Sequence, residues 1–199
     1  MAIVVVGPPG AGKGTRIEEA KKVIPNLESI STGNVLRKNK IDVSSGKLIP
    51  DAVIMELLKK ELKTVKADIV IFDGVPRTVP QAEAMMKSGI EVDFVIYLPI
   101  SEEVAIKRAM DRLVCSNPEC QLPYTKGDFN PPKVEGICDE CGSKLVTRSD
   151  DNEETIKERH RIYREKTEPL LEWWKAHDIP IKTVDADSSM DLFIEALLE

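Results

Sequence analysis

The chain has 199 residues, of which 42% are hydrophobic and 31% charged, and its formal net charge is −6. This composition is typical of one globular core with a small appendage, and no apolar run approaches the length that crosses a bilayer. The acidic balance argues against a general surface for nucleic acids or anionic membranes, but a local cluster of Lys and Arg can still bind a nucleotide.

The first element is a short β-branched run, Ala2-Ile3-Val4-Val5-Val6, which predicts a buried strand. A helix is expected over residues 16–23, and a glycine-rich loop, Gly7-Pro8-Pro9-Gly10-Ala11-Gly12-Lys13-Gly14-Thr15, lies between the two. This order is the context of a phosphate-binding loop, whose backbone N–H groups, helix N-terminus and lysine attract a polyphosphate. The alternative is a Gly/Pro turn with no such role.

The residue after Lys13 is Gly14, and the hydroxyl comes one position later at Thr15. This variant of the loop resembles that of the nucleoside monophosphate kinases, and of the adenylate kinases in particular. The resemblance implies that ATP, with Mg²⁺, is held by the loop residues Gly10, Ala11, Gly12, Lys13, Gly14 and Thr15.

Apolar runs and helical patterns alternate along the rest of the chain. Strands are expected at residues 3–6, 27–30, 69–72, 94–98 and 181–184. Helices are expected at residues 16–23, 52–62, 80–87, 102–112, 153–176 and 190–198. The alternation predicts an α/β fold, a three-layer sandwich in which helices cover both faces of a parallel five-stranded sheet. Ligands of such sheets bind beyond the carboxyl ends of the strands, where the main motifs lie.

The second strand leads into Ser31-Thr32-Gly33-Asn34-Val35-Leu36-Arg37. This segment resembles the Ser-Thr-Gly-Asp-x-x-Arg segment of adenylate kinases, which implies that Thr32 lies near the adenine of AMP and Arg37 grips its phosphate. A fixed guanidinium can hold a phosphate through two parallel hydrogen bonds. Taken alone, the segment favours a helix capped at Thr32 and followed by a solvated arginine.

The third strand ends in Asp73-Gly74-Val75-Pro76-Arg77-Thr78-Val79-Pro80-Gln81, which resembles the family's Asp-Gly-Phe-Pro-Arg-x-x-x-Gln stretch. The resemblance implies that Asp73 holds Mg²⁺ through bound waters, that Gly74 and Arg77 bind AMP, and that Gln81 reads the adenine edge. An amide suits that task because it can both donate and accept hydrogen bonds. By the same analogy, Thr32 together with Gln81 favours AMP over UMP or CMP. The alternative is a strand, a turn and a helix start with exposed polar residues.

The helix expected at residues 102–112 ends in Lys107, Arg108 and Arg112. The resemblance implies that Arg112 packs near the adenine of ATP. Many relatives continue with Gly-Arg-Arg, whereas Leu113-Val114-Cys115-Ser116 follows here. We therefore expect phosphate charge to be met by fewer groups, or by Lys126 or Lys133.

The run from Arg148 to Arg159 resembles a Thr-Arg-x-Asp-Asp-x-Glu-Glu-x-x-x-x-Arg run of the family. The resemblance implies that both arginines contact the phosphates. Acids in a first helical turn, with Asp151 as the N-cap, are also plain helix chemistry, and the two interpretations are compatible because capping leaves the arginines available.

The four cysteines form two pairs, Cys115 with Cys120 and Cys138 with Cys141. In a reducing compartment such pairs favour a metal over disulfides, and four sulfur ligands make a closed, structural zinc site. Four free thiols, disulfides, or iron or cobalt in place of zinc remain as alternatives.

Two insertions are expected to interrupt the core domain, which comprises residues 1–30, 61–112 and 147–199. Residues 31–60 would form a shortened AMP-binding insertion, and residues 113–146 a lid of the zinc-binding type.

The predicted function is reversible transfer of a phosphoryl group from ATP to AMP, giving two ADP, with Lys13, Arg77, Arg112, Arg148 and Arg159 as the catalytic cations. The alternatives are a kinase for UMP, CMP or GMP, and a nucleotide-regulated module whose zinc ribbon binds RNA or protein. We expect a cytoplasmic protein, because the first strand begins at Ala2 and leaves no room for a targeting segment. We also expect a monomer without nucleic-acid or membrane partners.

Overall fold

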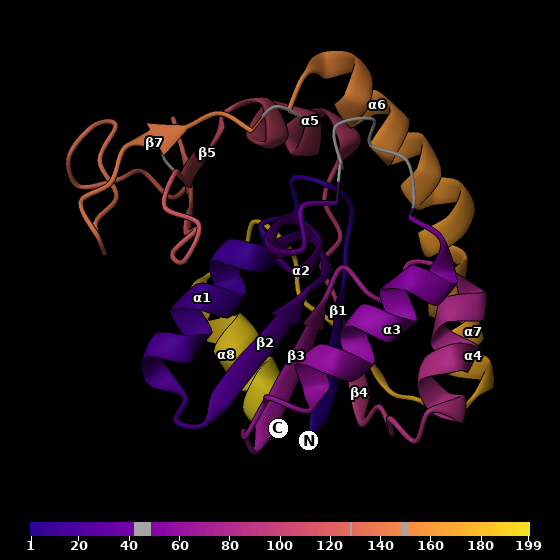
Figure 1. Ribbon diagram of the computed structural model, residues 1–199. Coiled ribbons are helices and arrows are strands. Elements are labelled where there is room, and N and C mark those ends of the chain that lie inside the picture. Colours follow the sequence, from indigo (N-terminus) through magenta and orange to yellow (C-terminus); the bar gives the residue numbers. More distant parts are fainter. Residues whose placement is uncertain (42–48, 128, 149–150) are drawn as a thin grey trace.

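The computed structural model describes residues 1–41, 49–127, 129–148 and 151–199, and for Arg37 it describes the backbone only. Its centre is a five-stranded sheet with the strand order β2-β3-β1-β4-β8 (Figure 1). All neighbouring strands are parallel, which confirms the predicted α/β fold. The strands are β1 (Ala2–Val6), β2 (Leu27–Ser31), β3 (Ile69–Asp73), β4 (Phe94–Tyr97) and β8 (Ile181–Thr183).

The register of the sheet brings the ends of its central strands to one edge. Asp73, the last residue of β3, pairs with Ser31 of β2 and with Val5 of β1. The segments that follow these three strands therefore start side by side. Both chain termini lie at the opposite end of the sheet (Figure 1).

Side chains of β1 alternate between two hydrophobic cores, because successive residues of a strand point to opposite faces. Val4 and Val6 pack in one core, whereas Ile3 and Val5 pack in the other. The helices that surround the sheet are α1 (Lys13–Val23), α2 (Thr32–Lys38), α3 (Asp51–Leu62), α4 (Val79–Lys87), α5 (Glu102–Met110), α6 (Glu153–Ile162), α7 (Pro169–Ala176) and α8 (Met190–Leu198).

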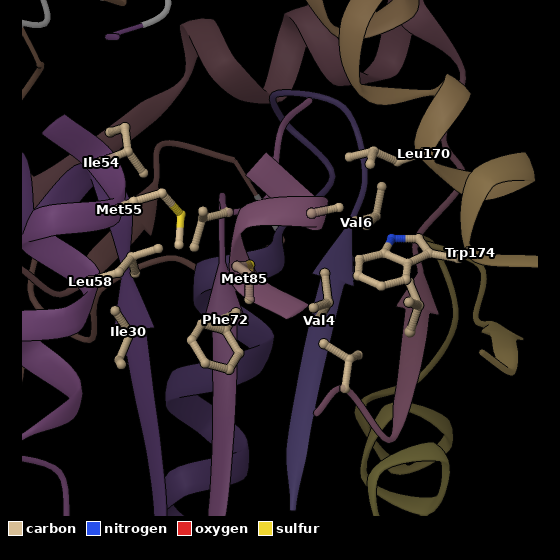
Figure 2. Close-up of a cluster of buried hydrophobic side chains, with 14 of the residues drawn as sticks. Val4, Val6, Ile30, Ile54, Met55, Leu58, Phe72, Met85, Leu170 and Trp174 are labelled. Carbon is tan, nitrogen blue, oxygen red and sulfur yellow. The ribbon is translucent and has the colours of Figure 1, made fainter. Parts of the chain in front are cut away.

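The two cores give the predicted three layers. Helices α3, α4 and α7 supply Leu58, Met85 and Trp174 to the first core, where they surround Phe72 and Val4 (Figure 2). Helices α1 and α8 close the second core on the other face of the sheet, through Ile17, Phe193 and their neighbours.

Two predicted helices are wrong in their extent. The helix expected at residues 102–112 ends at Met110, and Arg112 is the first residue of strand β5 (Arg112–Cys115). The helix expected at residues 153–176 is interrupted by one π-helical turn, η1 (Tyr163–Thr167), and resumes at Pro169 as α7. The N-cap of α6 is Asn152, whose side chain accepts a hydrogen bond from the Thr155 N–H, and not Asp151.

A second, antiparallel sheet projects beyond α5, with the strand order β6-β5-β7 (Figure 1). Its other strands are β6 (Pro123–Thr125) and β7 (Leu145–Val146). A small core of Cys115, Tyr124 and Cys138 lies under it. This sheet occupies the segment expected to form a lid. Within the described residues, no helix is both long and apolar enough to span a bilayer.

Candidate functional site

The principal cavity of the protein, of ≈ 280 Å³, lies at the edge where β1, β2 and β3 end. Helix α6 and the small sheet also contribute to its wall. Ala11 is fully buried and does not line the cavity, and the side chain of Arg37 lies outside the described residues. Of the predicted nucleotide-binding residues, the cavity is lined by Gly10, Gly12, Lys13, Gly14, Thr15, Thr32, Asp73, Gly74, Arg77, Gln81, Arg112, Arg148 and Arg159.

Two positions of the glycine-rich loop require glycine for geometric reasons. Gly10 and Gly12 have φ angles of 90° and 77°, which side chains of L residues rarely adopt. A Cβ atom at Gly10 would lie 2.0 Å from the carbonyl oxygen of Ala105 in α5. At Gly12 it would lie 2.7 Å from the ring of Phe129. The loop therefore packs tightly between α5 and Phe129.

Lys13, the first residue of α1, folds back over the loop. Its Nζ donates hydrogen bonds to the carbonyl oxygens of Gly7 (2.6 Å) and Pro8 (3.0 Å). Its pKa is lowered to about 8, chiefly by burial; Asp73 opposes this shift, and the charges of Arg77 and Arg112 add to it. This lysine thus lies among cations, where a bound anion would stabilise its charged form.

Arg77 is held by the turn that precedes α4. Its Nε donates to the carbonyl oxygen of Gly74 at 2.8 Å, and its own carbonyl oxygen accepts from the Thr167 hydroxyl at 2.9 Å. Burial lowers the pKa of the Arg77 guanidinium, Asp73 opposes this shift, and Arg159 adds to it. The π-helical turn that contains Thr167 thereby fixes the backbone of an arginine in the cavity.

A buried carboxylate ties the small sheet to α6. The side chain of Asp151 is fully buried and receives two hydrogen bonds from the Arg112 guanidinium, with 2.8 Å between Nε and Oδ2. Nη1 of Arg159 lies 3.8 Å from the same carboxylate. The first strand of the small sheet and the start of α6 are therefore joined through one acid.

The charges on the cavity wall are unbalanced. Among the described lining residues six are cations and two are acids, namely Glu18 and Asp73. The chain as a whole carries a net charge of −6, so this concentration of positive charge is local. Because like charges repel in a partly buried site, the cavity is suited to a ligand with several negative charges. The cations are Lys13, Arg77, Arg108, Arg112, Arg148 and Arg159.

Thr32, the first residue of α2, marks a polar position on the cavity wall. Its hydroxyl oxygen is buried and has no hydrogen-bond partner among the residues that the structure describes. Buried polar groups in proteins are nearly always paired, so this hydroxyl is available to a ligand.

Two lining residues, Arg108 and Phe129, were assigned no role from the sequence. The Arg108 guanidinium of α5 lies 4.1 Å from the centroid of the Phe129 ring, and both residues line the cavity beside Gly12. Guanidinium groups and aromatic rings both stack on nucleotide bases. The only signal for Phe129 was a lone aromatic residue in a segment of polar residues, proline and glycine.

His160 was assigned no role from the sequence, yet it joins α6 to the glycine-rich loop. The Pro9 carbonyl can only accept, so the Nε2 atom of His160, 3.0 Å away, donates this hydrogen bond. Burial lowers the pKa of His160, which favours the neutral ring. This contact positions the helix that carries Arg159.

The structure gives no support to the expectation that Lys126 or Lys133 supplies the phosphate-binding charge of the arginines found after the position of Arg112 in many relatives. Neither residue lines the principal cavity within the described part of the chain. Lys133 lines a separate cavity of ≈ 150 Å³ between α1 and the small sheet.

The four cysteines form one cluster beneath the small sheet. Their Sγ atoms all lie within 4.8 Å of one another, with 3.4 Å between Cys115 and Cys141 and 3.7 Å between Cys120 and Cys138. Four sulfurs at the corners of a tetrahedron, each ~2.3 Å from a central metal ion, are about 3.8 Å apart. All four thiols are free of disulfides. Hydrogen bonds from Ser143 lower the pKa of Cys141 to about 6, so this thiol is readily ionised. The cluster fits a four-coordinate metal ion.

The glycine-rich loop between β1 and α1, the parallel sheet and the cationic cavity define the class of P-loop nucleoside monophosphate kinases. The model of the family described as adenylate kinase matches residues 5–179. The chain belongs to the adenylate kinase family.

Curated relatives support this assignment over the whole chain. An adenylate kinase of Lachnospira eligens is 38% identical, and the alignment covers 100% of this chain and 99% of the relative. An adenylate kinase of Methanosarcina barkeri is 36% identical, with 99% and 96% covered. One from Fervidobacterium nodosum is 39% identical, with 99% and 95% covered.

We predict that Asp151→Ala lowers the free energy of unfolding by about 3 kcal/mol, because it removes a buried acid from between two guanidiniums. Urea denaturation followed by circular dichroism measures this loss. The control is Glu102→Gln, which breaks an exposed ion pair with Arg164 and should change stability little. Equal effects of the two substitutions would contradict a structural role for the buried carboxylate.

Proposed function

We propose that the protein catalyses the reversible, Mg²⁺-dependent transfer of the γ-phosphoryl group of ATP to AMP, which yields two ADP. The observation that carries this proposal is the set of six cations that line one cavity, together with Phe129, Thr32 and Gln81. Two nucleotides that meet at their phosphates would match this arrangement of charge.

The donor nucleotide, ATP, binds along the glycine-rich loop. Gly10, Gly12, Gly14 and Thr15 provide backbone around its phosphates, and Lys13 provides a charge. Ala11 is left out of this set because it is buried away from the cavity. Arg108 and Phe129 hold its base. Arg112 serves its phosphates rather than its adenine, because the Arg112 charge already acts on Lys13 and its guanidinium is paired with Asp151.

The acceptor nucleotide, AMP, binds where β2 and β3 end. Arg77 and Arg37 hold its phosphate, and Gly74 lets the chain turn closely around it. The Thr32 hydroxyl and the Gln81 amide face its base. These polar groups form hydrogen bonds with adenine. A base that left them without hydrogen-bond partners would bind more weakly, so this wall selects adenine over the other bases.

The chemistry requires alignment and charge rather than a protein nucleophile. The phosphate of AMP attacks the γ-phosphorus of ATP in line, and Lys13, Arg77, Arg112, Arg148 and Arg159 stabilise the charge of the migrating group. Mg²⁺ would neutralise phosphate charge, and Asp73, which lines the cavity, would hold it through water.

Residues 31–60 and 113–146 form the AMP-binding insertion and the lid, and residues 1–30, 61–112 and 147–199 form the core domain. Closure of the two insertions excludes water, which would otherwise compete with AMP. Cys115, Cys120, Cys138 and Cys141 hold a structural Zn²⁺ that makes the lid one rigid body. Free thiols of this kind suit a reducing compartment such as the cytoplasm, and a monomer suffices because one chain supplies all six cations.

The direct test of this function is turnover with ATP, Mg²⁺ and each of AMP, GMP, UMP and CMP, with ADP as the measured product. We expect AMP to be the preferred acceptor. Lys13→Ala should lower turnover by ~10³-fold or more while circular dichroism stays unchanged, because it removes a charge from the transferring group. Lys22→Ala, an exposed lysine of the same helix, is the matched control. Preference for another acceptor, or normal turnover of the Lys13 variant, would contradict the proposal.

The affinity for ATP should fall as pH rises through about 8, the pKa of Lys13 in the free protein. ATP binds the charged lysine better than the neutral one, so affinity is constant below this pH and is lost above it. One pH unit higher, only about a tenth of the free protein carries this charge, which predicts a roughly tenfold weaker affinity. Calorimetric titration with a non-hydrolysable ATP analogue measures this. The Lys13→Met variant should bind weakly at every pH. Constant wild-type affinity would refute the role of Lys13.

Removal of metal should lower the melting temperature by about 5 °C or more, because metal binding contributes directly to folding of the small sheet. Turnover at low temperature should change less, since the four cysteines that hold the metal are not among the cations that bind the phosphates. Elemental analysis before and after chelation identifies the metal, and added Zn²⁺ should restore the melting temperature. The absence of metal from protein that was prepared under reducing conditions would contradict the proposed zinc site.

A further inference from the structure

The Gln81 side chain in α4 is held at both ends of its amide. Its Oε1 accepts a hydrogen bond from the backbone N–H of Arg77 at 2.7 Å. Its Nε2 donates to Oδ1 of Asp51, the first residue of α3, at 2.6 Å. Gln81 is only 2% exposed, so its end of both contacts is buried.

Each partner of this amide has a single hydrogen-bonding role. A peptide N–H only donates, and an ionised carboxylate only accepts. If the amide turned over, Nε2 would face the N–H of Arg77 and Oε1 would face the Asp51 carboxylate. Two favourable contacts would become two repulsive ones in a buried place. The two partners therefore fix which end of the amide is the donor.

The fixed amide still has hydrogen-bonding capacity for a ligand. Nε2 keeps a second hydrogen and Oε1 keeps a second lone pair, and Gln81 lines the principal cavity. Thr32, with its unpartnered hydroxyl, lines the same cavity. Asp51 is not among the lining residues, so it acts on a ligand only through Gln81.

We propose that Asp51 is a specificity-determining residue that acts by positioning Gln81. Adenine presents an acceptor at N1 and a donor on C6, whereas hypoxanthine and guanine present a donor at N1 and an acceptor on C6. An amide fixed in one orientation pairs with only one of these two orders. This inference rests on the proposed acceptor site for AMP.

Asp51 also has an ordinary role that the test must separate from this one. It is an acid in the first turn of α3, where the helix dipole favours negative charge, and the helix has no side-chain N-cap. Loss of that role would lower stability and would affect all acceptors alike. Only a change in the ratio of the kcat/KM values for two acceptors reports the orientation of Gln81.

The experiment compares AMP with inosine monophosphate, whose base differs from adenine only at the N1 and C6 edge. In Asp51→Asn the new side chain can offer Gln81 either a donor or an acceptor, so the amide can turn over at lower cost. Asp51→Ser has the same freedom and favours a helix start, which provides a second variant if the first is unstable. The matched control is Glu56→Gln, the same chemical change on the exposed side of α3.

We expect the ratio of kcat/KM for AMP to that for inosine monophosphate to fall about tenfold in both Asp51 variants and to stay constant in the control. An unchanged ratio, or an equal loss for both acceptors, would overturn the inference while the proposed function stands. Wild-type protein that transfers no phosphoryl group to AMP would overturn both.

Discussion

An excess of partly buried positive charge governs this structure. Among the residues that the structure describes, six cations and two acids line one cavity, and burial lowers the pKa of both Lys13 and Arg77. Such an arrangement is unfavourable without a ligand, because each charge is separated from water and repelled by its neighbours. A chain of phosphates reverses this balance, so the same repulsion that costs stability in the free protein gives affinity and transition-state stabilisation.

The fold meets this constraint by position and by selective pairing. The parallel sheet brings the ends of β1, β2 and β3 to one edge, so loops that are far apart in the chain share one cavity. Asp73 partly offsets the positive charge around Lys13, and Asp151, which does not line the cavity, pairs with Arg112. The remaining polar groups are oriented by neutral contacts, such as those of Gln81 with Arg77 and of His160 with Pro9.

Much of this could be predicted from the sequence because the signals are local. The β-branched run before Gly7 and the glycines around Lys13 define a strand and a phosphate-binding loop without any distant contact, and the five strands were found to within a residue or two. Contacts between distant segments could not be predicted in this way. The stacking of Arg108 on Phe129 and the hydrogen bond from Gln81 to Asp51 join residues far apart in the chain. Arg112 was placed in a helix because its strand is only four residues long and forms by pairing with later segments.

The central claim is that one cavity aligns two adenine nucleotides through their phosphates. A crystal structure with an analogue that joins two adenosines through a phosphate chain tests this most directly. The predicted result is phosphates in contact with Lys13 and Arg77, one base against Arg108 and Phe129, and the other beside Thr32 and Gln81. A phosphate chain bound away from Lys13 and Arg77, or an analogue that fails to bind, would contradict it.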